Sequence, residues 1–204
     1  MQRSIAAAAY LKCVKNKGVG KAINIAHSSS PESIRIENPV SFSKYTNDII
    51  TYTIKHKLNS HYCFLIDMKI ASGLKRFYVY DLKKDTVLQA GLVTHGSSNH
   101  DTDSVLFSNI PGSNCTSLGK YKIGKSYRGK FGLAYKLYGL DKTNSNAFNR
   151  FVVLHSHLCV PENEIAPREI CKSWGCPTVA PIFLAQLKTY IEKSPAPIML
   201  WIFD

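Results

Sequence analysis

The spacing of apolar residues predicts a chain built mostly from short strands. Residues 62–70 (YCFLIDMKI) form a long apolar run with aromatic and β-branched members, which favours a buried strand. Residues 75–82 and 86–96 form two further runs, and the three residues KKD between them favour a tight turn. We therefore expect a β-hairpin directly after the first strand.

Farther along the chain, glycines divide the apolar pattern. Residues 117–141 (SLGKYKIGKSYRGKFGLAYKLYGLD) predict many short strands and turns, as is typical of a sandwich or barrel. Residues 151–160 (FVVLHSHLCV) predict another strand. Because side chains alternate along a strand, one face would carry five of these residues. They are Phe151, Val153, His155, His157 and Cys159.

The C-terminal part contains the clearest helical pattern. Residues 181–193 (PIFLAQLKTYIEK) show apolar positions at helical spacing. The predicted stripe consists of Ile182, Leu184, Leu187, Tyr190 and Ile191. Residues 197–203 (PIMLWIF) predict a buried final strand.

The N-terminal part has a different composition. Residues 3–17 are rich in alanine and favour a helix, which the two glycines of KNKGVGK end. HSSSPES at 27–33 is a loop and a candidate boundary. We expect an N-terminal extension over residues 1–45, helical in part, and one mainly β domain over residues 46–204 with one or two helices.

Length and charge narrow the functional classes. The 204 residues suit one ordinary domain, and no apolar run approaches the ~20 residues of a membrane helix, so stable membrane insertion is not expected. The start is basic with a short apolar stretch, but Lys12 and Lys15 follow at once, so it forms no clear signal peptide. The net charge of +12 could face nucleic acid, membrane or an acidic polymer. Because Lys and Arg are scattered, we do not expect nucleic-acid binding.

The stretch SWGCP around Cys176 is the main candidate for chemistry, and three interpretations compete. Zinc binding is one, with His155, His157, Cys159, Cys171 and Cys176 as potential ligands, although the spacing matches no compact zinc module. A structural role is the second, since cysteines are often buried. The six cysteines could also pair, and Cys171 is near enough in sequence to bridge Cys176.

Nucleophilic catalysis is the third interpretation. A thiolate attacks a carbonyl carbon while a nearby imidazole takes its proton. Gly175 permits a sharp turn and a close backbone approach, and the N–H groups near Gly175 and Cys176 could stabilise an oxyanion. Trp174 would form an apolar wall of the site or a core aromatic. The residues by themselves leave all three interpretations open.

Several longer motifs extend this pattern. LVTHGSSN, FSNIPGSNCTSLGKY, GLDKTNSNAFNRF and SWGCP follow one another in order. Together they resemble the murein L,D-transpeptidase catalytic-domain proteins of the YkuD-like superfamily, from about residue 60 to the C-terminus. The resemblance implies a mainly β YkuD-like catalytic fold and a cysteine nucleophile that needs neither a metal nor an organic cofactor.

The resemblance also implies roles for single residues. Cys176 falls on the nucleophile of the S-x-G-C motif that Ser173 opens. His155 falls on the histidine that ends the preceding strand, and Ser156 falls on the next position, whose backbone carbonyl orients the imidazole. His157 takes no role from the family. The chain departs from the commoner pattern at Trp174, where His is usual, and at Ser156, where Gly is usual.

His95 belongs to a His-Gly turn that the family also contains. It could line the substrate groove, or it could be an ordinary turn residue at a strand end.

The implied reaction is acyl transfer on peptidoglycan stem peptides through a thioester on Cys176, with His155 as acid and base. An L,D-carboxypeptidase or endopeptidase with the same two residues is an alternative. A non-catalytic wall-binding protein and a zinc-bound structural protein are two others. The resemblance implies a location in the periplasm or cell envelope.

Overall fold

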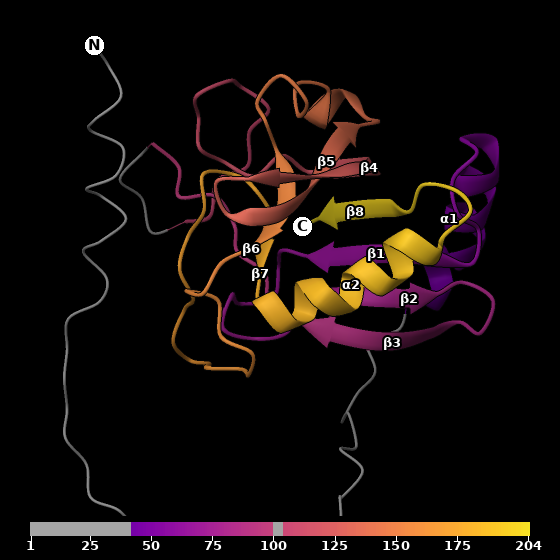
Figure 1. Ribbon diagram of the computed structural model, residues 1–204, viewed down its shortest axis with the longest axis horizontal. Coiled ribbons are helices and arrows are strands. Elements are labelled where there is room, and N and C mark those ends of the chain that lie inside the picture. Colours follow the sequence, from indigo (N-terminus) through magenta and orange to yellow (C-terminus); the bar gives the residue numbers. More distant parts are fainter. Residues whose placement is uncertain (1–41, 100–103) are drawn as a thin grey trace, which may run out of the picture. The chain divides into compact units, whose positions relative to one another are not determined.

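The computed structural model describes residues 42–99 and 104–204, so the helix predicted at 3–17 lies outside the described residues. Within them, eight strands form one sheet in the order β3-β2-β1-β8-β4-β5-β6-β7 (Figure 1). The strands are β1 (Tyr62–Asp67), β2 (Phe77–Asp81), β3 (Thr86–Gly91), β4 (Gly119–Gly129), β5 (Gly132–Gly139), β6 (Val153–Ser156), β7 (Thr178–Val179) and β8 (Met199–Phe203). The helices are α1 (Ser43–Lys55) and α2 (Pro181–Lys193), with a 3₁₀ turn η2 (Lys142–Asn144).

The expected mainly β fold with one or two helices is confirmed. The β1–β8 and β6–β7 pairs are parallel, and the other pairs are antiparallel. An isolated bridge joins Val93, just after β3, to Val179 of β7. Because β3 and β7 are the first and last strands in the order, this bridge curls the sheet toward a barrel.

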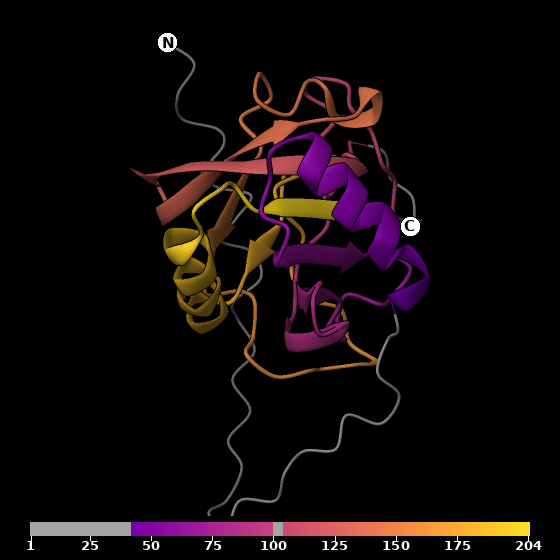
Figure 2. The same cartoon turned by 90° about the vertical axis from the view of Figure 1, so that its right-hand side faces the viewer.

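Each face of the central strands packs against one helix (Figure 2). In β1, Cys63 and Leu65 join the cluster that contains Ile49 of α1. Phe64 and Ile66 join the other cluster, which contains α2 residues. A strand that is buried on both faces has no polar side, which explains why residues 62–66 are all apolar.

The sequence pattern does not predict α1. Its sequence SKYTNDIITYTIK is rich in Thr and Ile, which are poor helix formers, and the buried residues include Thr46 and Thr53. Tertiary contacts hold the helix instead. The Thr46 hydroxyl donates to Asp85 at 2.6 Å, and the Tyr80 hydroxyl donates to the same carboxylate. The domain boundary expected at 45/46 falls inside the first turn of α1.

The glycine-rich stretch 117–141 contains one long hairpin, not the many short strands expected. β4 has 11 residues and β5 has 8, and only Lys130 and Phe131 separate them. The glycines fit within the pairing. Gly124 lies where the register shifts, and a Cβ there would come within 2.3 Å of the Tyr138 ring.

The strand expected over 151–160 is shorter than predicted. β6 covers only Val153–Ser156, because Phe151 has a left-handed backbone with φ of 57° that cannot continue a strand. His157 lies just beyond the strand, and Cys159 lies in the following turn. The prediction that all five alternate residues share one strand face is therefore wrong, because Phe151 precedes β6 and His157 and Cys159 follow it.

Helix α2 has the predicted bounds, but its buried stripe differs at one position. Phe183, Leu184 and Leu187 are buried, whereas Ile182 is 60% exposed. Ile182 and Phe183 are adjacent apolar residues in the first turn of the helix, so periodicity alone does not show which of the two is buried.

The stripe can be tested by a matched pair of substitutions. Leu187→Ala should lower the free energy of unfolding by about 2–5 kcal/mol, because it leaves a cavity under the helix. Ile182→Ala should change it by no more than about 0.5 kcal/mol. Urea unfolding followed by circular dichroism measures both, and equal losses would contradict the assigned face.

Candidate active site

The loop that carries Cys176 lies between a disulfide and the sheet. Cys159 and Cys171 form the disulfide, so Cys171 is not the partner of Cys176, the pairing considered from the sequence. The thiol of Cys176 is free, and the residue keeps part of its surface exposed. The loop then enters β7, which lies beside β6 (Figure 1).

Three hydroxyl groups converge on the backbone carbonyl of Cys176. The Ser173 hydroxyl lies 2.7 Å from this oxygen, the Thr94 hydroxyl 3.1 Å and the Thr178 hydroxyl 3.4 Å. Ser173 is buried, and its N–H donates to the carbonyl of His95 at 2.8 Å. These contacts fix the backbone that holds the thiol.

Gly175 has a conformation that other residues adopt with difficulty. Its φ is 100°, and an added Cβ would lie 2.5 Å from the carbonyl oxygen of Cys115. Its N–H donates to the Ser173 hydroxyl at 3.1 Å. Of the two N–H groups expected to face an oxyanion, the Gly175 group is thus engaged inside the loop.

His155 is buried at the end of β6, with its two ring nitrogens in different surroundings. Nδ1 lies 3.1 Å from the Ser156 carbonyl oxygen, and Nε2 lies 3.0 Å from the Thr178 hydroxyl. Because a carbonyl oxygen only accepts, Nδ1 carries the proton in the neutral ring and Nε2 is the acceptor. Burial lowers the pKa of His155, and the nearby His157 lowers it further, so the neutral ring is favoured.

Phe131 covers the imidazole from the tip of the β4–β5 hairpin. Its ring stacks on His155 with centroids 5.2 Å apart and meets His157 edge-on at 5.7 Å. His157 itself accepts the Cys159 N–H at Nδ1. Neither Phe131 nor Thr178 stands out in the sequence, because their contacts with His155 come from other strands.

Burial also shifts the pKa of the Cys176 thiol. Protein atoms around the sulfur raise the pKa of Cys176, while the Val153 N–H and the Arg150 guanidinium act in the opposite direction without overcoming it. The thiol donates to the Phe151 carbonyl at 3.8 Å. Arg150 is held by the carbonyls of Ser108 and Cys115 at 2.8 and 2.7 Å. Thiol and imidazole are therefore both favoured as neutral groups at rest.

The remaining predicted residues lie around this centre in different ways. Trp174 is 54% exposed, so it is a surface aromatic of the Cys176 loop and not part of the core. His95 is buried, its Nδ1 lies 3.0 Å from the Gly96 carbonyl, and burial lowers its pKa. Its contact with the Cys176 loop is made by its backbone carbonyl, which accepts the Ser173 N–H.

An apolar cavity of about 320 Å³ is lined in part by Phe151, the residue whose carbonyl faces the Cys176 thiol. Its lining comprises Tyr127, Lys136, Phe148, Phe151, Val152 and Val153. The Phe151 carbonyl faces the Cys176 sulfur, so the cavity and the thiol share one wall. Lys136 places its ammonium 5.7 Å from the centre of the Phe148 ring.

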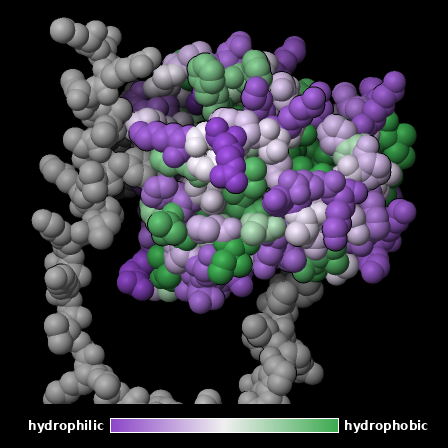
Figure 3. Space-filling view, in the orientation of Figure 1, coloured by the Kyte–Doolittle hydropathy of each residue, from purple (hydrophilic) through white to green (hydrophobic). Residues whose placement is uncertain are grey.

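The disulfide uses two of the five residues considered as zinc ligands. Within residues 42–99 and 104–204, no group of three or more His, Cys, Asp or Glu side chains is arranged to hold a metal ion. In the same residues, no helix is long and apolar enough to cross a membrane. Hydrophilic side chains spread over the face drawn in Figure 3, with apolar side chains in separate small groups.

The raised pKa of Cys176 can be measured by alkylation. At each pH a larger fraction of this thiol should be protonated than in free cysteine, so its rate with iodoacetamide should rise with a midpoint above about 8.5. Mass spectrometry of the labelled peptide reports the rate, with Cys176→Ala as the blank. A rate that stays high down to about pH 5 would instead indicate a resting thiolate–imidazolium pair.

The sequence profile of the L,D-transpeptidase catalytic domain matches residues 36–200. No curated protein matches the chain. Among solved structures, the helical cell shape determining protein Pgp2 from Campylobacter jejuni is 11% identical, with a TM-score of 0.49 over 70% of this chain and 47% of that one.

An L,D-transpeptidase from Mycobacterium smegmatis is 13% identical, with a TM-score of 0.42 over 71% of this chain and 59% of that one. An L,D-transpeptidase from Xylanimonas cellulosilytica is 10% identical, with a TM-score of 0.38 over 75% of this chain and 68% of that one. The chain spans about half the length of the Pgp2 structure.

Proposed function

The chain belongs to the L,D-transpeptidase catalytic domain family, and from this premise we propose that it is a cysteine acyltransferase acting on peptidoglycan stem peptides. Cys176 is the nucleophile and His155 the general base and acid. The Ser156 carbonyl orients the imidazole, and Ser173 and Gly175 shape the loop. The expected catalytic domain of residues 46–204 is widened to take in all of α1, so it begins at or before Ser43, and the residues that precede it are an extension.

One observation carries the proposal. The Ser156 carbonyl, the His155 ring, the Thr178 hydroxyl and the Cys176 carbonyl form a continuous series of contacts of 3.1, 3.0 and 3.4 Å. This series orients an imidazole, leaves Nε2 as an acceptor, and places it beside the loop of a free cysteine. A purely structural cysteine needs no such arrangement.

In the first step, the thiol proton moves to Nε2 of His155 while the sulfur attacks the carbonyl between an L-centre and a D-centre. The carbon–nitrogen bond breaks, and the imidazolium returns the proton to the leaving amine. A thioester remains on Cys176. At rest the Thr178 hydroxyl donates to the lone pair of Nε2. For the transfer this hydroxyl turns its proton to the Cys176 carbonyl, which frees the lone pair for the thiol proton, and it then accepts from Nε2–H.

In the second step, the side-chain amine of another stem attacks the thioester and loses a proton to His155. The thiol is restored, and an amide cross-link forms. Water in place of the amine gives hydrolysis, the L,D-carboxypeptidase outcome. The partial exposure of Cys176 leaves the thioester within reach of water, so both products belong to one mechanism.

The surroundings suit a stem peptide. The apolar cavity beside Phe151 can take the aliphatic part of a residue next to the bond that breaks, and exposed Trp174 and His95 in its turn border the loop. The net charge of +12 attracts the carboxylates of the wall. This substrate places the protein in the periplasm or elsewhere in the cell envelope.

Removing the nucleophile tests the reaction. Cys176→Ala should abolish both amine transfer and hydrolysis of purified tetrapeptide stems, since both products pass through the thioester. Cys176→Ser should not restore activity, because one imidazole ionises a hydroxyl poorly. Mass spectrometry of the products gives the result, and a thermal melt verifies folding. A folded Cys176→Ala protein that still releases the terminal D-residue would place the nucleophile elsewhere.

The two neighbouring histidines provide a matched control for this assay. His155→Ala should lose nearly all turnover. His157→Ala should keep most of it, because His157 lies beyond β6 and accepts the Cys159 N–H. The opposite result would overturn the assignment of His155.

Thr178 offers a second prediction. Thr178→Val keeps the shape of the side chain but removes the hydroxyl that faces Nε2, so the rate of thioester formation should fall about tenfold or more. Thr178→Ser should restore most of the rate. Single-turnover kinetics with a stem peptide measures both, and a Val variant as fast as the Ser variant would show that the hydroxyl takes no part.

A further inference from the structure

A second cavity lies at the far end of α2 from Cys176. It has a volume of about 690 Å³ and lies between residues 58–62, the turn after β2, and the end of α2 with residues 194–196. α2 begins five positions after Cys176, and Lys193 in its last turn borders the cavity. A helix of 13 residues is about 20 Å long, so this cavity is separate from the active site.

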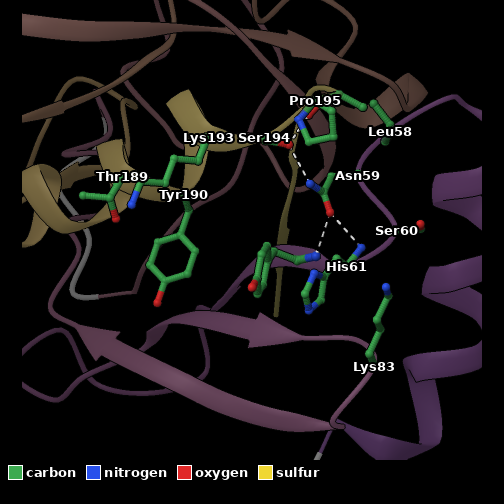
Figure 4. Close-up of a pocket in the computed structure, with 12 residues that line it drawn as sticks. Leu58, Asn59, Ser60, His61, Lys83, Thr189, Tyr190, Lys193, Ser194 and Pro195 are labelled. Carbon is green, nitrogen blue, oxygen red and sulfur yellow. Dashed lines mark hydrogen bonds between the residues drawn. The ribbon is translucent and has the colours of Figure 1, made fainter.

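Asn59 holds the two sides of the cavity together (Figure 4). Its side-chain NH₂ donates to the Ser194 hydroxyl at 2.5 Å, and its side-chain oxygen accepts the N–H groups of His61 and Tyr62 at 2.7 and 2.8 Å. Its own N–H donates to the Pro197 carbonyl at 2.9 Å. All these groups are used within the protein, so the cavity is formed before any ligand arrives.

Two cations border this space. Lys83 enters from the turn after β2 and Lys193 from α2 (Figure 4). Among the described residues, neither forms an ion pair. The nearby Asp81 is buried, pairs with His61 at 3.3 Å and accepts the N–H groups of Lys83 and Lys84. One carboxylate therefore stands against two ammonium groups, so the cavity keeps a net positive charge.

Aromatic rings form the remaining wall. Tyr62 and Tyr190 meet edge-to-face with centroids 5.4 Å apart, and His61 stacks on Tyr62 at 3.9 Å. A tyrosine offers an apolar ring and a polar hydroxyl, which suits the apolar face and the hydroxyl groups of a sugar. The hydroxyls of Ser60 and Thr189 in the lining add further polar groups.

We propose that this cavity binds an acidic sugar of the peptidoglycan glycan strand at a position without a stem peptide, where the sugar carboxylate is free, with the ring against Tyr190 and the carboxylate between Lys83 and Lys193. The identity of the polymer rests on the proposed function, whereas the site itself rests on the contacts above. Binding here would hold the strand to the enzyme, and would raise the effective concentration of its stems at Cys176.

The test measures binding without the active site. Cys176→Ala protein is titrated by calorimetry with soluble glycan strands from which all stem peptides have been removed. Replacing both lysines (Lys83→Gln with Lys193→Gln) should weaken binding by about tenfold or more, as expected for the loss of hydrogen bonds to charged groups. Tyr190→Ala should also weaken it, whereas Tyr190→Phe should retain most of the affinity.

A matched control removes the same charge elsewhere. Lys69 and Lys142 are exposed and lie outside the cavity. Lys69→Gln with Lys142→Gln should leave the affinity within about twofold of the parent, since distant surface charges contribute little. An equal loss in both pairs, or no binding by the parent, would overturn the inference.

The result is independent of the reaction. With Cys176 intact, the Lys83 and Lys193 variant should process free tetrapeptide stems at the parent rate and lose activity only on stems attached to glycan strands that also carry sugars without stems. A parent enzyme that is inactive on every stem would instead overturn the proposed function.

Discussion

The backbone carbonyl of Cys176 is the acceptor around which the active site is organised. Hydroxyls from Thr94, Ser173 and Thr178 lie 2.7–3.4 Å from this one oxygen, the first from the segment after β3 and the other two from the Cys176 loop and β7. Because a carbonyl oxygen has only two lone pairs, the contact at 3.4 Å is the weakest of the three. The Thr178 hydroxyl is thereby left to donate mainly to the imidazole of His155.

That arrangement depends on the register of two short strands. His155 of β6 pairs with Thr178 of β7. A shift of one residue would turn the Thr178 side chain to the opposite face, and the imidazole would lose its partner. The register is stabilised by the buried cluster that contains Leu154, Val179 and the first turns of α2. Core packing therefore sets the contact between His155 and Thr178 on which the proposed reaction depends.

Burial has two opposing effects on this site. It orients the reacting groups, and it also disfavours their charged forms, raising the pKa of Cys176 and lowering that of His155. The Arg150 guanidinium lessens this effect at the thiol, but backbone carbonyls already engage it. A neutral resting thiol reacts slowly with adventitious electrophiles. In the proposed reaction, charge separation would then accompany attack on the substrate.

The sequence by itself determined the mainly β class, the bounds of α2, the β2–β3 hairpin and the family, because these follow from local periodicity and from contiguous motifs. It also indicated Cys176 and His155 as candidates. Only the tertiary structure decided the helix α1, the Cys159–Cys171 pairing, the stacking of Phe131 on His155 and the contact of Thr178 with Nε2. The disulfide and the two contacts of His155 each join residues from separate segments of the chain. Helix α1 has weak helix propensity and is stabilised by packing against the sheet. Such contacts leave no periodic trace in the sequence, because they depend on strand order and register.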